Sequence, residues 1–256
     1  MARKLSRFAA AAVLALVIPS PPALAAGAAH PSPVELDHVW IMVSPGAPER
    51  KALKNAGFLF APGTNRHDGQ GTASITVELD NAYVELMWPD SSVAVEPSLE
   101  RAAEKFRERM LWRTSGWCPI GIGLRQTTEA DDSLPFPTWS WTADWMPKGT
   151  SMVMLTPRDD TRSPALFIEP RALSGAAEQA ARAAPFHHPI GCRRVTAVHL
   201  VGPRGYKPIA PLEYLQAEHV LGIRAGDQWL LELTLDGGSR RQTRDLRPSL
   251  PIVVRY

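Results

Sequence analysis

Within residues 36–88 a strand, a short helix and three further strands are expected in succession, and this order constrains the fold more than any other feature. Apolar side chains alternate along 36–43, as they do in a strand with one buried face. Residues 48–56 begin with a proline and are followed by Gly57, which is typical of a helix. Three short segments then have strand character: 58–60, 72–79 and 82–88. The sequence therefore predicts a β-α-β-β-β unit.

The remainder of the chain combines helices with further short strands. Residues 98–113 place apolar side chains at helical spacing, so an amphipathic helix is expected there. Four segments have strand-like patterns: 120–125, 138–143, 151–155 and 165–168. A strand at 195–201, a helix at 211–221 and a strand at 228–235 repeat the opening order in outline. The sequence therefore predicts an α+β fold with a diverged internal duplication.

The first 25 residues have the form of a secretory signal. Basic residues precede an apolar run at 8–18, and Ala-Leu-Ala at 23–25 is a small-x-small cleavage site. The apolar run is too short for a membrane span, which needs about 20 residues. We therefore expect residues 1–25 to be removed, residues 26–33 to form a flexible lead, and the mature protein to be periplasmic or secreted.

Composition places the chain among ordinary globular proteins. Of its 256 residues 45% are hydrophobic and 21% charged, which excludes an intrinsically disordered chain. Removing the three positive charges of the leader from the net +2 leaves −1. This near-neutral charge argues against a nucleic-acid partner. After cleavage, no remaining apolar run is long enough to hold the protein in a membrane.

Two cysteines, Cys118 and Cys192, each stand just before an apolar alternating run. In an oxidising compartment such a pair can form a disulfide that ties two strand entrances together. Two buried free thiols are the alternative. The sequence leaves both open, because it does not give the distance between the two Cα atoms.

Strand alternation indicates where the chemistry lies. Along 36–43 one face is mostly aliphatic, while the opposite face carries His38 among large side chains. In the strand at 82–88, Glu85 lies in the middle of an apolar run, which costs free energy unless the carboxylate is paired or binds a metal. We therefore expect His38 and Glu85 to look into one cavity. The residues expected to contact its ligand are Trp40, Met42, His67, Tyr83 and Met87.

Two further candidates come from the C-terminal stretch. Glu232 aligns with Glu85 in the apparent repeat, and His199 lies two positions from the residue that aligns with His38, so it keeps the same face. Glu169 is a rival for the second carboxylate. The expected metal ligands are His38, Glu85, His199 and Glu232, with the two glutamates also expected to be catalytic. Such a mixed nitrogen and oxygen set suits zinc, iron, nickel or manganese.

The motifs together form a recognisable pattern. Leu36-Asp37-His38-Val39 is followed by a Pro/Gly turn and a helix, and Tyr83-Val84-Glu85-Leu86 closes the unit. Between them stand Gly57-Phe58, Pro62-Gly63, His67, Gly69 and Gly71-Thr72. This pattern resembles the glyoxalase-like domain of the vicinal oxygen chelate superfamily, which includes glyoxalase I, bleomycin-resistance proteins, extradiol dioxygenases and methylmalonyl-CoA epimerase.

The resemblance implies paired β-α-β-β-β modules whose sheets curl around a cavity, with extra strands and helices between them. The whole glyoxalase-like domain would span 34–256. Its expected parts are a first module at 34–89, middle strands at 117–170 and a C-terminal module at 193–256.

The resemblance also implies a divalent metal that chelates neighbouring oxygens of a small substrate and stabilises an enediolate-like anion. His38 and Glu85 match the first-module ligands, whereas no histidine stands at the matching second-module position. One interpretation is an exported glyoxalase/dioxygenase-like protein, acting as a lyase, isomerase or dioxygenase. The other is a metal-free module of the bleomycin-resistance type that binds or sequesters a small molecule. Many relatives of this fold complete one cavity from two chains, so a homodimer is compatible with both.

Overall fold

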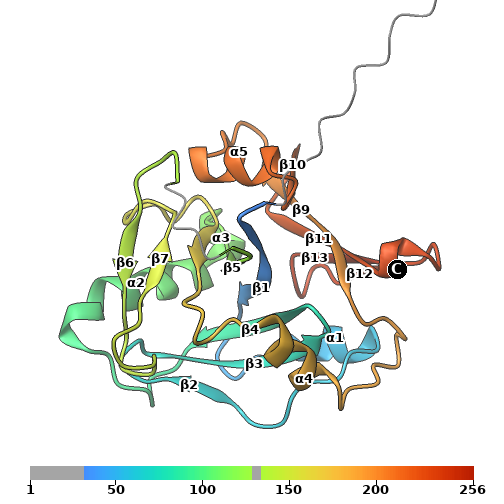
Figure 1. Cartoon of the computed structure of the whole chain (residues 1–256), viewed down its shortest axis with the longest axis horizontal. Helices are drawn as coiled ribbons and strands as arrows, with labels where there is room; N and C mark the ends of the chain where they lie inside the picture. Colours follow the sequence, from blue (N-terminus) through green and yellow to red (C-terminus); the bar gives the residue numbers. More distant parts are fainter. Residues whose placement is uncertain (1–31, 129–133) are drawn as a thin grey trace, which may run out of the picture. The chain divides into compact units, whose positions relative to one another are not determined.

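Eight strands form the larger of two sheets in the computed structural model, which describes residues 32–128 and 134–256. In spatial order they are β2 (Asn65–His67), β3 (Thr72–Leu79), β4 (Ala82–Pro89), β1 (Val34–Met42), β5 (Ile120–Gln126), β8 (Ala165–Ile168), β7 (Met152–Met154) and β6 (Trp139–Trp141). The sheet curls, so that β2, β3 and β4 run across the bottom of Figure 1 while β6 and β7 stand upright at its left.

The two halves of this sheet are wound alike. In the first half β1 runs parallel to β4, and in the second half β5 runs parallel to β8. The halves meet where β1 and β5 pair antiparallel, and the register there sets His38 opposite Gly123 and Trp40 opposite Gly121. The centre of the sheet therefore carries the histidine that the sequence singles out.

Five strands form the second sheet: β10 (Gly222–Gly226), β9 (Val195–Pro203), β11 (Leu230–Leu235), β13 (Ile252–Arg255) and β12 (Thr243–Asp245), in that order. Helix α5 (Ala210–Ala217) joins β9 to the parallel strand β10. β9 pairs antiparallel with β11, whereas β1 pairs parallel with β4. The C-terminal stretch thus resembles the opening in its local pattern but not in its strand pairing.

The remaining helices are short and lie beside the larger sheet. They are α1 (Arg50–Asn55), α2 (Glu100–Met110), α3 (Trp112–Ser115) and α4 (Ala176–Ala183), with 3-10 turns at Pro97–Leu99 and Asp236–Gly238. α2 contacts β4 and β1, and α4 contacts β3. The helix expected over 98–113 is split, because the chain leaves helical geometry at Leu111. The segment 58–60 is not a strand.

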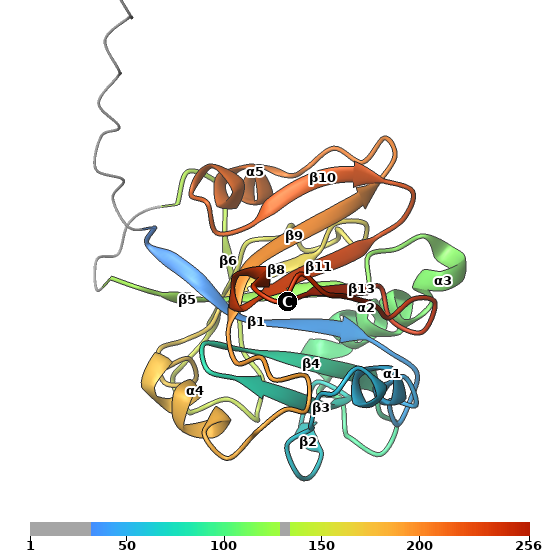
Figure 2. The ribbon, with the colours of Figure 1, turned by 90° about the vertical axis from the view of Figure 1, so that its right-hand side faces the viewer.

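The two faces of β1 bury different kinds of side chain, as the alternation predicts. Val39 and Ile41 belong to an aliphatic core that both sheets share, with Leu200 and Leu231 from the second sheet. Figure 2 shows the second sheet beside β1. On the opposite face, Trp40 lies in a separate cluster of tryptophan, methionine and phenylalanine side chains. The larger sheet therefore has one face for the core and one face for a cavity.

Cys118 and Cys192 are both buried free thiols, so the disulfide is not formed. The expected signal at 1–25 and most of the lead at 26–33 lie outside the described residues. Among the helices of the described segments, none is long and apolar enough to cross a membrane.

Candidate functional site

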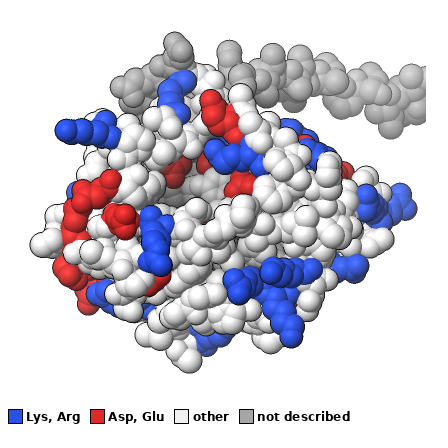
Figure 3. All heavy atoms as spheres, turned by 90° about the horizontal axis from the view of Figure 1, so that it is seen from below, with Lys and Arg blue, Asp and Glu red and all other residues white. Residues whose placement is uncertain are grey.

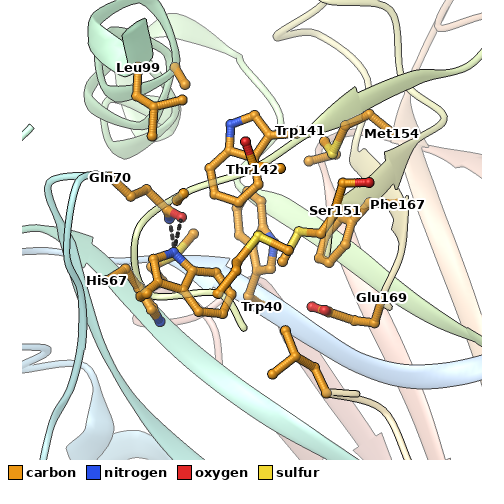
Figure 4. A pocket seen from close by; sticks show the side chains of 18 of the residues that line it. Trp40, His67, Gln70, Leu99, Trp141, Thr142, Ser151, Met154, Phe167 and Glu169 are labelled. Carbon is orange, nitrogen blue, oxygen red and sulfur yellow. Dashed lines mark hydrogen bonds between the residues drawn. The ribbon is translucent and has the colours of Figure 1, made fainter. Parts of the chain in front are cut away.

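A cavity of about 1740 Å³ lies on the Trp40 face of the larger sheet. Its walls come from β1, β2, β4, the β6–β7 region, α2 and the end of β8 (Figure 4). Seen from below, the molecule is hollowed, and acidic and basic side chains gather around the hollow (Figure 3). The sequence-predicted residues on the cavity wall are His38, Trp40, His67, Tyr83, Glu85 and Met87. Met42 is fully buried in the cluster that contains Trp40.

The ring of His38 is held on every side. Its Nδ1 donates a hydrogen bond to the Asp37 carboxylate at 2.9 Å. The Tyr83 ring stacks on it, with 4.3 Å between centroids and 13° between planes, and Phe167 meets it edge-on at 5.4 Å. A Cβ at position 123 would come within 2.3 Å of its Cε1, so only glycine leaves room for the ring. His38 is therefore fixed with Nε2 toward Glu85.

Arg125 and the nearby carboxylates determine the protonation states of Asp37 and His38. Arg125 bonds Asp37 through Nη1 at 3.2 Å, and its Nη2 donates to the Asn81 carbonyl at 2.7 Å. Burial alone would raise the pKa of Asp37, but the hydrogen bonds and charges of His38 and Arg125 outweigh it and lower that pKa. Burial alone would lower the pKa of His38, but Asp37 and the nearby carboxylates Glu169 and Glu85 raise it. The fold thus favours an imidazolium beside a carboxylate.

Glu85 lies between two histidines. Its Oε2 is 4.0 Å from His38 Nε2, and its Oε1 is 3.7 Å from His67 Nε2. The Nδ1 of His67 hydrogen-bonds the Thr72 hydroxyl at 2.9 Å. The pKa of His67 is lowered, mainly because burial outweighs the attraction of Glu85. The two histidines therefore differ, with His38 favoured as the charged form and His67 as the neutral form.

Glu169 completes this group from the other half of the sheet. It directly follows β8, is 6% exposed, and its Oε2 has no hydrogen-bond partner among the described residues. In Figure 4 its carboxyl group points into the cavity. Burial raises its pKa to about 7, against the attraction of His38. We refer to His38, His67, Glu85 and Glu169 as the acid–base cluster.

His199 and Glu232 do not join this cluster. Both lie on the second sheet, where they are direct cross-strand neighbours. His199 is exposed, and Glu232 is held by Arg224 at 2.6 Å and Arg255 at 3.0 Å in a separate hollow. Of the four expected metal ligands the structure brings together only His38 and Glu85. The reason is that residues 193–256 form their own sheet and pack their aliphatic face on the shared core.

The donor atoms around Glu85 lie at separations that two ligands of one metal ion can have, because two bonds of about 2.0–2.2 Å place their donor atoms about 4 Å apart or less. The donor pairs around Glu85 are separated by 3.7 and 4.0 Å. Within residues 32–128 and 134–256, no three His, Cys, Asp or Glu side chains are arranged to hold a metal ion. The donor types suit a transition metal, which His38 and Glu85 would hold, and the same arrangement also forms an ion-pair and proton-transfer network.

Two glycines that leave room for the site were not predicted to be part of it from the sequence. Gly123 makes room for His38, and a Cβ at Gly121 would come within 1.9 Å of the Trp40 ring. Glycines at alternate positions of a strand, facing one side, signal close approach from a neighbouring element. The Gly-x-Gly of β5 carried this signal, but the sequence does not show that β5 pairs with β1.

Comparison with known proteins supports the fold alone. No protein-family model matches the chain, and no curated protein matches it. A solved structure of a hypothetical protein from Staphylococcus aureus is similar, with 9% identity and a TM-score of 0.50, covering 86% of this chain and 98% of that one. A hypothetical protein from Bacillus halodurans C-125 matches with 16% identity and a TM-score of 0.34, over 54% and 94% of the two chains, a likeness too weak to carry an argument.

Proposed function

We propose that this chain is a glyoxalase-like protein that transfers a proton on a small molecule bearing neighbouring oxygen atoms. The observation that carries the proposal is the Glu169 carboxyl oxygen, which no described residue partners and which is aimed into the same cavity that His38 lines. A buried acid without a partner costs free energy, and such sites are favoured where a ligand supplies the missing interaction.

The strand arrangement supports membership of the vicinal oxygen chelate superfamily. Both halves of the larger sheet have their first strand parallel to their last, as paired β-α-β-β-β modules require. In this interpretation the second module is formed by β5, β6, β7 and β8, so Glu169 is the counterpart of Glu85 and Gly123 stands opposite His38. The residues 193–256 are then an addition to the paired modules.

The chemistry follows from the protonation states of the cluster. The ionised Glu169 removes a proton from a carbon next to a carbonyl group of the ligand, and the electron pair moves onto the carbonyl oxygen. His38, charged because of Asp37, donates a hydrogen bond from Nε2 to that oxygen and stabilises the enolate. Glu169 then returns the proton to carbon. A base with a pKa near 7 is well suited to this exchange at neutral pH.

Deuterium exchange tests the proposal without knowledge of the natural substrate. The mature protein is mixed with hydroxyacetone or 2-hydroxyacetophenone in D2O, and loss of the proton signal next to the carbonyl is followed by NMR. We expect the protein to accelerate exchange and Glu169→Gln to reduce the acceleration by roughly 100-fold. Glu232→Gln is the matched control, because Glu232 is equally buried but lies outside the cavity. Equal rates for both variants, or no acceleration by the wild type, would refute the proposal.

Export is part of the proposal and is supported by the leader sequence. Fractionation of cells that express the full chain, followed by N-terminal sequencing, tests it. We expect the protein in the periplasm or the medium, beginning near Ala26.

A further inference from the structure

The cavity wall and the shared core differ in the kinds of apolar side chain they use. Valine, isoleucine and leucine make up 30 of the 40 buried residues of the core, which also holds Trp88 and Trp229, and no described methionine belongs to it. In contrast, six of the seven methionines and four of the eight tryptophans lie in the cluster on the cavity side. Aliphatic side chains would line a cavity for an alkyl chain equally well. The different composition of the cavity wall therefore points to the kind of ligand that the cavity binds.

We refer to six of these side chains as the Trp/Met wall: Trp40, Trp139, Trp141, Trp145, Met152 and Met154. Their neighbours fix the orientation of the indoles. Trp145 donates its Nε1–H to Gln70 at 3.2 Å, and Trp139 donates to the Thr156 carbonyl at 2.9 Å. The ring of Trp40 lies against the Gly121 backbone, where a Cβ would be 1.9 Å away. With the N–H groups of Trp139 and Trp145 satisfied, these indoles present ring faces and edges rather than polar atoms.

The wall and the acid–base cluster meet in one cavity, so a ligand would contact both. His67 of the cluster lies against Trp145, with 5.3 Å between ring centroids. Phe167 contacts His38 and belongs to the same apolar cluster as Trp141. Figure 4 shows Trp141, Met154 and Phe167 on the side of the cavity from which Glu169 projects. Charged side chains such as Arg101, Lys105 and Asp159 also line the cavity but do not belong to the wall.

We infer that the molecule bound here carries a planar aromatic ring system, which the Trp/Met wall holds, with its oxygen-bearing end at the acid–base cluster. Indole faces stack on flat rings, and thioether sulfurs make favourable contacts at ring edges. A saturated ring of the same size gains neither interaction. The inference rests on the proposed function for the position of the oxygen-bearing end, and on the wall alone for the aromatic body.

Two probes of equal size isolate the aromatic contribution. 2-Hydroxyacetophenone and 1-cyclohexyl-2-hydroxyethanone have the same hydroxyketone group, but the first carries a flat aromatic ring and the second a puckered saturated ring. Dissociation constants are measured by titration calorimetry with the mature wild-type protein. We expect the phenyl compound to bind about tenfold more tightly than the cyclohexyl compound. Equal binding, or tighter binding of the cyclohexyl compound, would overturn the inference.

Variants show whether the preference comes from the wall. We expect Trp141→Leu and Trp145→Leu each to reduce the phenyl preference, while Trp117→Leu, outside the cavity and half-buried, leaves it unchanged. Thermal unfolding checks that each variant folds, and the half-buried Trp145 serves if the more buried Trp141 cannot be replaced. A preference that survives both wall substitutions would contradict the inference.

The two proposals fail separately. Tight binding of the phenyl compound without deuterium exchange would leave the aromatic inference standing and refute proton transfer. Exchange on hydroxyacetone without any preference for the phenyl ring would support proton transfer and refute the aromatic inference.

Discussion

The imidazole of His38 occupies the space that a side chain at position 123 would need, since a Cβ there would lie 2.3 Å from His38 Cε1. The two residues face each other across the β1–β5 junction, where the halves of the larger sheet meet. The position of His38 therefore depends on a glycine in another strand, more than 80 residues later in the sequence.

Replacing Gly123 by alanine is expected to displace the His38 ring and to reduce deuterium exchange by about 100-fold, because small misplacements of catalytic groups have large effects. The same change at Gly222 is the matched control. A Cβ there would come within 2.4 Å of the exposed His199 on the other sheet. Gly123→Ala should lose about 1–3 kcal/mol of stability in chemical unfolding, and Gly222→Ala should lose less, because the exposed His199 side chain can move aside. Full exchange activity in Gly123→Ala would show that the His38 position is not required.

The raised pKa of Glu169 predicts a pH dependence of stability. Its native value of about 7 lies above the ordinary 4.5, so the native state binds this proton more tightly than the unfolded chain. The carboxyl group favours the native state at low pH, and this advantage is lost as the pH rises from about 4.5 through about 7. Relative to Glu169→Gln, the wild type should lose up to about 3 kcal/mol over that interval. Urea unfolding at a series of pH values measures the difference, and parallel curves would contradict the prediction.

Chelation tests whether proton transfer needs a metal. Because the proposed exchange uses only the Glu169 carboxylate and the His38 imidazolium, we expect it to be unchanged after dialysis against EDTA. Loss of exchange that zinc, iron, nickel or manganese restores would show instead that the cluster closes around an ion. The His38→Ala/Glu85→Ala double variant would then lose the bound metal in elemental analysis.

The state of the cysteines can be measured directly. Cys118 and Cys192 are free and buried, and burial raises the pKa of the Cys118 thiol to about 12. We expect a thiol reagent to titrate two groups in the exported protein, and only after unfolding. A reductant should leave the melting temperature unchanged. A protein without free thiols that melts lower in reductant would contradict this arrangement.

Much of the first half of the site could be predicted from the sequence, because it depends on alternation within single strands. The faces of β1 and β4 follow from that alternation, which is why His38 and Glu85 could be assigned to one cavity wall. The bounds of β3 and β8 were also predicted as observed. Local pattern is enough where a strand has one face in the core.

The second half could not be predicted, because it depends on which strands pair. Glu232 matches Glu85 in local pattern, whereas Glu169 stands at the end of a four-residue strand with little pattern of its own. Only the parallel pairing of β8 with β5 brings Glu169 to His38, and pairing between distant segments leaves no local signature. The role of Gly123 could not be predicted for the same reason, because it depends on the pairing of β5 with β1.

The most direct test of the account measures the His38 pKa by NMR of its ring nitrogens in the wild type, in Glu169→Gln and in Glu232→Gln. The charge of Glu169 helps to raise that pKa, so Glu169→Gln should lower it, and Glu232→Gln should leave it unchanged. An unchanged His38 pKa in Glu169→Gln, or an equal fall in both variants, would contradict the claim that the Glu169 carboxylate acts on the imidazole within one cavity.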